Sequence, residues 1–321
     1  MSDFSFRPWQ EGDDLALLQV WSDVENGPQQ SFRTMLAVDS DEAPWRRTLV
    51  AEHQGIPVAA ATVYETSLHN RHLWAYVEVA PDHRRNGLGT ELLQRLRAEA
   101  ASAPSGVTSL RAKVAVGSSG AAFAAASGLR EIQRSRTVRV EAGSVPPVPL
   151  RINDDDQPTQ AIEDIATGSV ELTKKFWDFY RRSHQWDPPA EISIGRVNRL
   201  FLSDEAEALG AVVLRDQIIE ARREGKKGDI KAFAVSYRPF EQDSPDFQIP
   251  DDAATEVLIG YDFDYPGARE AIMQVLSLLV AQYPVTLEVD DSMEDLATMI
   301  EPLLKMGAAS VEEDTLVVAE K

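Results

Sequence analysis

The chain has 321 residues, 43% of them hydrophobic, which suffices for ordinary cores in two domains. Its 52 acidic side chains outnumber 32 Lys and Arg, and the net charge of −20 disfavours nonspecific attraction to nucleic acid and anionic lipid. The lack of cysteine excludes disulfides, thiolate metal sites and cysteine-acyl intermediates, and no apolar run approaches the ~20 residues that span a bilayer. Because the acidic N-terminal stretch has no signal-peptide features, we expect a cytoplasmic protein that binds neither nucleic acid nor membrane.

Hydrophobic periodicity and turn residues predict alternating strands and helices in the first half of the chain. The predicted elements, in chain order, are a strand at 4–7, helices at 14–24 and 31–38, strands at 48–53, 57–65 and 73–79, a helix from residue 88, a strand at 109–116, a helix at 120–127 and a strand near 137–140. The leucines at 88, 92, 93 and 96 have helical spacing. They predict that the helix after the strand at 73–79 begins near residue 88.

A short glycine-bearing loop joins the strand at 73–79 to this helix. Gly87 and Gly89 lie where backbone N–H groups are free and where no Cβ keeps a ligand away. Arg84 and Arg85 add positive charge from the same turn. The loop is therefore expected to bind an anion such as a pyrophosphate, which the positive end of the helix dipole also favours.

Two well-known phosphate loops do not match this segment, since a Walker loop needs Gly-Lys-Ser/Thr and a dinucleotide fingerprint needs a third glycine. The run Arg84-Arg85-Asn86-Gly87-Leu88-Gly89 instead resembles the acyl-CoA signature of the GNAT N-acetyltransferase superfamily, Arg/Gln-x-x-Gly-x-Gly/Ala. The Val-x-Pro just upstream and the order of the flanking elements are also similar to that family. The alternative is an anion-binding turn in another α/β fold.

The resemblance implies an acyl-CoA site built from the loop and from the strand before it. In the family this strand splays from its neighbour, so backbone groups of Val77 and Val79 would contact the pantetheine arm and the acyl carbonyl. Ser119 would supply a hydroxyl to the pantetheine arm, or would cap the helix at 120–127. The residues implied for acyl-CoA binding are Val77, Val79, Arg84, Arg85, Asn86, Gly87, Leu88, Gly89, Thr90 and Ser119.

The resemblance also implies a mechanism, in which an amine attacks the thioester directly within a ternary complex. Glu78 is the nearest carboxylate that could take a proton from an ammonium acceptor; the alternative is a solvated carboxylate at a strand end. Many relatives protonate the leaving thiolate with a tyrosine, whose place is taken here by Ala124. Tyr76 could replace this acid, or could be a packed strand tyrosine.

A Pro- and Gly-rich break at 141–149 separates the two halves, so we expect one domain at 1–145 and a second at 146–321. The predicted elements of the second half are helices at 162–181 and 203–223, strands at 231–236 and 255–262, a helix at 268–283, a strand at 285–289, a helix at 293–306 and a strand at 315–319. This order repeats that of the first half, which indicates a duplicated domain.

The second copy of the loop lacks the phosphate chemistry of the first. Gly267 aligns with Gly87, but Asp264 takes the place of the first arginine of the signature and Arg269 that of its last glycine. An acid repels pyrophosphate, and a long side chain fills the space that glycine leaves. The chain thus resembles bacterial tandem GNAT proteins, which implies an α/β (α+β) fold of two GNAT-like domains. Each would be a mixed, mostly antiparallel twisted sheet flanked by helices, with an intact N-terminal and a degenerate C-terminal site.

The histidines and one aromatic group could in principle bind a metal or a substrate, but we expect them to have structural roles. The spacing of His69, His72 and His83 matches no zinc signature, so we expect loop histidines and no metal. The aromatic group at 176–186 has near-helical spacing and is expected in a core, with an acceptor pocket as the alternative.

We therefore predict an N-acetyltransferase that uses acetyl-CoA, or another acyl-CoA, as co-substrate and acts on a primary amine. The acidic charge suits a small cationic acceptor, although solubility is the commoner cause of such a charge. The alternatives are a non-catalytic acyl-CoA-binding regulator or scaffold, which the absent tyrosine would permit, and an acetyltransferase for a protein amino group. A monomer and a homodimer are both compatible with the sequence.

Overall fold

The computed structural model describes residues 4–21, 23, 27–238 and 253–321. The chain forms two compact units. The first consists of Met1–Arg134, Asp187–Ala190 and Thr315–Lys321, and the second of Ser135–Trp186 and Glu191–Asp314. Each unit has a mixed, mostly antiparallel sheet flanked by helices, so the predicted fold class is confirmed. Among the described residues, no helix combines the length and the apolar character needed to cross a bilayer.

The sheet of the first unit has the order β1-β2-β3-β4-β5, with the end of β12 beside β5. Its pairs are antiparallel except for β4 and β5, which are parallel. The strands are β1 (Phe4–Pro8), β2 (Arg46–His53), β3 (Ile56–Tyr64), β4 (Leu73–Val79), β5 (Leu110–Ala115) and β12 (Ala309–Ala319). The helices are α1 (Asp13–Leu18), α2 (Gly27–Arg33), the 3₁₀ turn η1 (Pro81–His83), α3 (Leu88–Ala100) and α4 (Ser119–Ala126).

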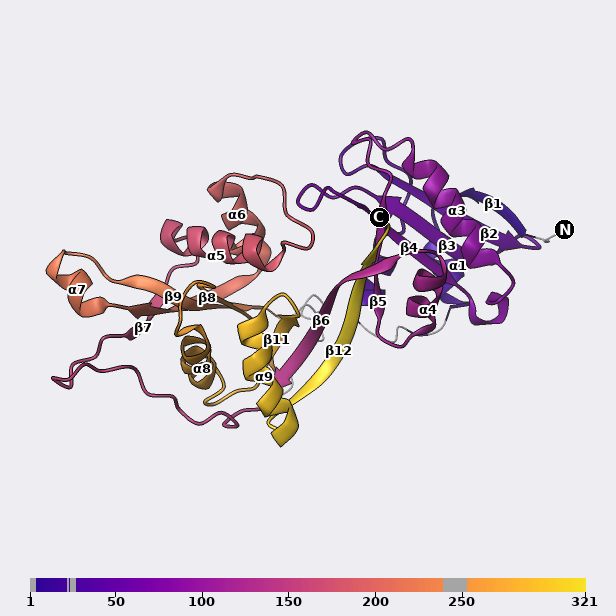
Figure 1. Ribbon diagram of the computed structural model, residues 1–321. Helices are drawn as coiled ribbons and strands as arrows, with labels where there is room; N and C mark the ends of the chain where they lie inside the picture. Colours follow the sequence, from indigo (N-terminus) through magenta and orange to yellow (C-terminus); the bar gives the residue numbers. More distant parts are fainter. Residues whose placement is uncertain (1–3, 22, 24–26, 239–252) are drawn as a thin grey trace. The chain divides into compact units, whose positions relative to one another are not determined.

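The second unit repeats this order as β7-β8-β9-β10-β11, again with one parallel pair, β10 and β11. Figure 1 shows α5 and α6 on one face of these strands and α8 on the other. The strands are β6 (Arg130–Val140), β7 (Ala161–Ile165), β8 (Ala208–Asp216), β9 (Asp229–Tyr237), β10 (Thr255–Tyr261) and β11 (Val285–Asp290). The helices are α5 (Val170–Ser183), α6 (Ile194–Phe201), η2 (Asp204–Ala206), α7 (Ile218–Arg223), α8 (Ala268–Leu279) and α9 (Glu294–Met306).

The last strands of the two repeats are exchanged. In the second unit the end of β6, Ser135–Val140, pairs antiparallel with β11. In the first unit the end of β12, Thr315–Ala319, pairs antiparallel with β5. Each sheet is therefore completed by a strand from the other half of the sequence. A boundary between the repeats near residue 145 stays a prediction.

Helix α3 is held in the first unit by the leucines whose spacing predicted it. Leu88, Leu92, Leu93 and Leu96 are all buried, and the helix packs against β3. The facing strand contributes the buried alanines at 59–61, whose small side chains let the helix approach closely. This packing places the first turn of α3 at the end of β4.

Of the helices predicted in the second half, the one at 162–181 begins too early and the one at 203–223 is wrong. The region 162–181 contains strand β7 and then α5, which begins after Ser169 because the serine hydroxyl accepts a hydrogen bond from the Leu172 amide. The region 203–223 contains η2, strand β8 and the short α7. Strand β8 is paired on both edges, with β7 and β9, and this long-range pairing overrides its helix-compatible spacing.

The remaining differences between the predicted and the observed elements concern the ends of helices and strands and one helix that was not predicted. Helix α6 was not predicted, although Ser193 caps it in the same way as Ser169 caps α5. The predicted helix at 14–24 ends at Leu18, and its residues 22 and 24 lie outside the described residues. The helix predicted at 31–38 is α2, which ends at Arg33. Strands β6 and β12 are each longer than predicted because they contribute to both units.

Candidate functional site

The parallel pair β4 and β5 separates along its length. Their register joins Leu73 to Leu110 and Trp74 to Arg111, and it stops there although the strands continue. The remainder of β4, residues 75–79, is paired with β3 on its other edge. An open edge of backbone groups therefore faces β5 in the second half of β4.

The amides of Val77 and Val79 lie on this open edge. The Leu73 N–H donates to Ser109 O at 2.9 Å, toward β5, whereas the Ala80 N–H donates to Val58 O at 2.8 Å, toward β3. Because backbone N–H groups alternate between the two edges of a strand, those of residues 75, 77 and 79 share the direction of Leu73. The two valines thus present backbone donors where the family resemblance implied contact with pantetheine and the acyl carbonyl.

The loop after β4 is exposed and has two residues in left-handed conformation. Arg85 has φ +65° and Gly87 has φ +81°, and a Cβ at Gly87 would meet open space. Such turns bring consecutive N–H groups to one side and form an anion-binding concavity. The Nε of Arg84 donates to the Val79 carbonyl at 2.9 Å, which ties the loop to the open edge.

The first turn of α3 continues this set of donors. Leu88 is buried, whereas Gly89 and Thr90 are more accessible, and amides at a helix start have no intrahelical partner. A Cβ on Gly89 would lie 3.6 Å from the Phe123 ring and 3.8 Å from Val79 Cγ2. The loop, the open edge of β4 and α4 therefore meet at Gly89.

At the start of α4, the structure distinguishes two serines. The helix is capped by Ser118, whose hydroxyl accepts from the Ala121 amide at 3.1 Å, so the capping role considered for Ser119 belongs to its neighbour. Ser119 is exposed. Ala124, which takes the place of the usual tyrosine, is buried and supplies no hydroxyl.

On the face of β4 away from the loop, the even-numbered residues contact α2. Phe32 stacks on Tyr76 with ring centroids 5.4 Å apart, and its ring lies 5.6 Å from that of Trp74. The Arg33 guanidinium forms a fork with Glu78, with Nε to Oε2 at 2.9 Å and Nη2 to Oε1 at 2.6 Å. Helix α2 therefore covers the even-numbered side chains of β4.

The sequence predicted that Glu78 and Tyr76 share one face of a strand. In the structure their side chains are joined by a hydrogen bond. The Tyr76 hydroxyl donates to Glu78 Oε2 at 2.6 Å, and Gln29 Nε2 donates to Oε1 at 3.1 Å. Glu78 is only 6% exposed, so it is not a solvated carboxylate. Burial, and then the nearby Glu78 charge, raise the pKa of Tyr76, which keeps the phenol protonated. The catalytic roles of both residues stay predictions.

Sequence reasoning missed Arg33 and Gln29. The helix predicted at 31–38 began too late to include Gln29, and nothing in the local pattern connects either residue to a strand 45 or more positions away. The available signal is their spacing, since Gln29, Phe32 and Arg33 share one helical face.

Comparison with known proteins identifies the first unit. Residues 12–125 match the model of the Acetyltransferase (GNAT) family. The chain carries a GNAT acetyltransferase domain. GNAT proteins use acyl-CoA as co-substrate, so this domain is an acyl-CoA-dependent acyltransferase domain. The open edge of β4 and the vacant side of Gly87 fit such a ligand.

Solved structures share the fold of the whole chain. A GCN5-related N-acetyltransferase from Sphaerobacter thermophilus has a TM-score of 0.62 at 15% identity, covering 100% of this chain and 96% of its own. A tandem GNAT protein from the clavulanic acid biosynthesis pathway has a TM-score of 0.58 at 15% identity, covering 98% of each chain. No curated protein matches in sequence. The chain therefore has the tandem GNAT fold, and these likenesses establish the fold alone.

The corresponding loop of the second GNAT-like unit has another conformation. Gly267, at the start of α8, has φ −95°, in contrast to the left-handed Gly87. A Cβ at Gly267 would lie 2.8 Å from the ring of Tyr265 and would overlap the guanidinium of Arg151. Arg269, which was predicted to fill this space, pairs instead with Asp295 at 2.7 Å.

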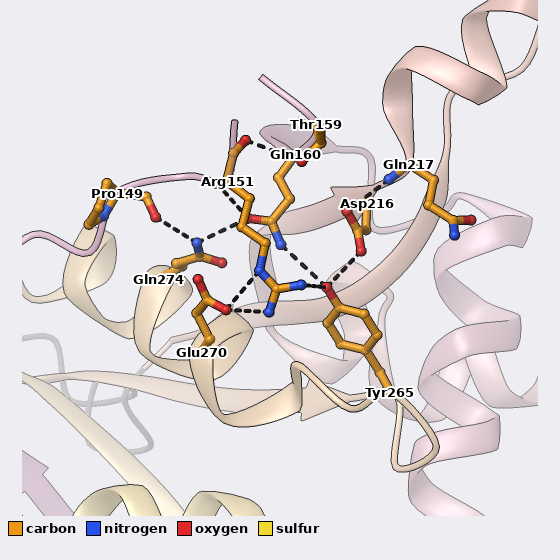
Figure 2. A network of polar contacts seen from close by, with 9 residues as sticks. All are labelled: Pro149, Arg151, Thr159, Gln160, Asp216, Gln217, Tyr265, Glu270 and Gln274. Carbon is orange, nitrogen blue, oxygen red and sulfur yellow. Dashed lines mark hydrogen bonds and ion pairs between the residues drawn. The ribbon is translucent and has the colours of Figure 1, made fainter. Parts of the chain in front are cut away.

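Figure 2 shows the network that surrounds Arg151. Its Nε donates to Glu270 at 2.8 Å and its Nη1 to the Tyr265 hydroxyl at 2.9 Å, while its Nη2 also bonds to Glu270. The Tyr265 hydroxyl donates to Asp216 at 2.6 Å. A cation from the chain itself, neutralised by Glu270, thus occupies the space beside the first turn of α8.

The other singled-out residues have structural partners. The Nδ1–H of His69 donates to the Asp187 carbonyl at 2.7 Å, and His83 Nε2 lies 3.4 Å from His53 Nδ1. The part of the chain that the structure describes contains no cluster of three or more metal-ligating side chains. In the aromatic group at 176–186, Phe176 and Phe179 pack against Phe233 in the core of the second unit.

Proposed function

We propose that this protein is a cytoplasmic N-acyltransferase that uses the first unit to transfer an acyl group, such as acetyl, from CoA to a primary amine. The observation that supports it most is the open backbone edge of β4 directly beside an exposed loop whose Gly87 is left-handed and unobstructed. The amide of Val77 or Val79 would donate to the oxyanion that forms when the amine attacks the thioester. The net charge of −20 favours a small cationic acceptor.

We further propose that the second unit binds no acyl-CoA. The support comes from the filled space at Gly267 and from the acidic residues around it, since Asp264 and Glu270 are already paired with Arg182 and Arg151. Phosphate oxygens would have to displace these pairs and approach the carboxylates, which costs free energy. The second unit then serves to complete the fold.

Calorimetric titration with acetyl-CoA, followed by assay of thiol release with primary amines, tests the proposed function. Binding followed by amine-dependent release of CoA thiol is the expected result. Binding without thiol release for small amines or for protein amino groups would instead indicate an acyl-CoA-binding regulator. Release that requires a folded protein would indicate a protein acetyltransferase. A lack of acetyl-CoA binding would contradict the site itself.

A further inference from the structure

The face of β5 that points away from α4 carries two basic residues. Val114 lies on the α4 side, because a Cβ added at Gly120 would be 3.8 Å from Val114 Cγ1. Arg111 lies on the other face, where its Cζ is 4.1 Å from the centre of the Trp74 ring. Side chains alternate between the two faces of a strand, so Lys113 shares the face of Arg111.

The two basic residues differ in their partners. Arg111 is buried and its guanidinium pairs with the carboxylate of Asp187. In the part of the chain that the structure describes, no carboxylate pairs with the ammonium of Lys113, although the sequence has 52 acidic side chains and only 32 Lys and Arg. Lys113 has intermediate exposure, so a small molecule from solvent can reach it. A partly enclosed cation without a counter-ion favours an anionic ligand.

Lys113 lies beside the open part of β4. The pairing of β4 with β5 stops at Trp74 and Arg111, and Lys113 is two residues further along β5. The loop after β4, the start of α3 and α4 meet near Val79 on the α4 side, where the cofactor would lie. On the opposite side, α2 covers the even-numbered side chains of β4. The approach to the thioester that remains on that side runs along β5, past Lys113.

The neighbours of Lys113 on its own face are apolar. Its cross-strand partner on β12 is Val317, and the next side chain of β5 on this face is the methyl group of Ala115. Neither can hydrogen-bond through its side chain. The ammonium of Lys113 is therefore the polar side-chain group that a ligand meets at this point of β5. It has three donors on a flexible stem, which can turn to bind a carboxylate.

We propose that Lys113 is a specificity-determining residue that binds a carboxylate of the acceptor; this rests on the proposed function. The acceptor is then a small molecule that has both a primary amine and a carboxylate and is cationic overall, as a basic amino acid is. The Lys113 ammonium donates to the carboxylate while the amine of the same molecule lies at the thioester. The net charge of −20 attracts the molecule, and Lys113 selects it over amines without a carboxylate.

The test compares acceptors that differ only in the carboxylate. CoA thiol release by the full-length protein is measured with acetyl-CoA and three pairs of amines, namely free lysine and cadaverine, ornithine and putrescine, and arginine and agmatine. In at least one pair, kcat/KM should be about 10-fold or more higher for the amino acid, because a hydrogen bond between charged groups is stronger than one to water. Equal values in all three pairs, or higher values for the decarboxylated amines, would overturn the inference.

Variants of Lys113 test whether this residue causes the preference. Lys113→Met keeps an unbranched side chain and should reduce the preference by about 10-fold, through a higher KM for the amino acid and not through weaker binding of acetyl-CoA. Lys113→Arg should retain the preference, and Lys113→Glu should reverse it. Lys174→Met, which removes an exposed lysine of α5, is the matched control and should keep the native preference. An unchanged preference in Lys113→Met would overturn the role of Lys113.

Two further outcomes separate this inference from the proposed function. Replacing acetyl-CoA by succinyl-CoA places the carboxylate on the acyl group, and a preference for succinyl-CoA that Lys113→Met removes would overturn the assignment to the acceptor. Thiol release with amines that favours no amino acid over its partner leaves the proposed function standing and overturns the inference alone. If the native protein releases no thiol with any amine, the proposed function fails and the inference fails with it.

Discussion

At the scale of single residues, Gly87 is the central position of the proposed acyl-CoA site. We expect Gly87→Trp to abolish measurable acetyl-CoA binding, because the indole would occupy the space above the loop amides. The left-handed backbone adds about 1–2 kcal/mol of strain. Gly12→Trp is the control, since Gly12 has φ +90°, an open side and the same place before a helix. Calorimetry and thermal unfolding should show similar destabilisation in both but loss of binding only at Gly87; native affinity in a folded Gly87→Trp would refute the site.

His69 makes the stability of the first unit dependent on pH. Burial, and then the charge of Arg111, lower its pKa from 6.5 to about 4. On acidification the unfolded chain takes up this proton first, so the contribution of neutral His69 is complete above pH 6.5 and is lost as the pH falls toward 4. Between pH 6.5 and pH 4, the free energy of unfolding measured with urea should fall by about 1–3 kcal/mol more in the native protein than in His69→Gln. Parallel losses in the two proteins would contradict the assignment.

At the scale of elements, the segment between β6 and β7 is fastened to α8. Besides the bonds of Arg151, Gln274 Nε2 donates to Pro149 O at 2.7 Å and to Gln160 Oε1 at 3.0 Å. We expect Arg151→Ala to lower the free energy of unfolding by about 1–2 kcal/mol, because it leaves Tyr265 and Glu270 without their shared partner. Arg182→Ala removes an exposed ion pair with Asp264 and should lower the free energy of unfolding by less than about 1 kcal/mol. Equal losses in urea unfolding would show that the segment is not fastened by Arg151.

Elements were predictable where one local pattern decided the outcome. Strand β4, its loop and α3 follow from β-branched and aromatic residues, two glycines and a leucine repeat, all within one short segment. Strand β8 was not predictable as a strand, because its pairing with β7 and β9 comes from tertiary context. The same holds for the site: the loop residues are contiguous, whereas the fork of Arg33 on Glu78 joins residues 45 positions apart.

At the scale of the whole molecule, the filled second loop predicts stoichiometry. Calorimetry should give one acetyl-CoA per chain for the native protein. It should also give one for Arg269→Gly, because Arg151 and Tyr265 still fill the space at Gly267. Two equivalents in the native protein would show that the second loop is functional, and two in the variant alone would show that Arg269 closes it.

The exchanged strands predict that neither sequence repeat is stable by itself. A fragment of residues 1–145 lacks the strand that pairs with β5, and it lacks Asp187, whose carboxylate pairs with the buried Arg111. An unpaired buried charge of this kind costs about 3–5 kcal/mol. We expect the fragment to show no cooperative unfolding and no acetyl-CoA binding, both of which should return on coexpression with residues 146–321. A fragment that folds and binds alone would contradict this.

The same exchange has a consequence for biosynthesis. Domains of a nascent chain generally fold in order of synthesis, the N-terminal one first. Here the sheet of the first unit is completed only by Thr315–Ala319, so β5 keeps an unpaired edge while the whole second repeat is being translated. We therefore expect a chain that is truncated before this strand to be inactive. During translation, the unpaired edge of β5 is the feature that a chaperone would have to protect.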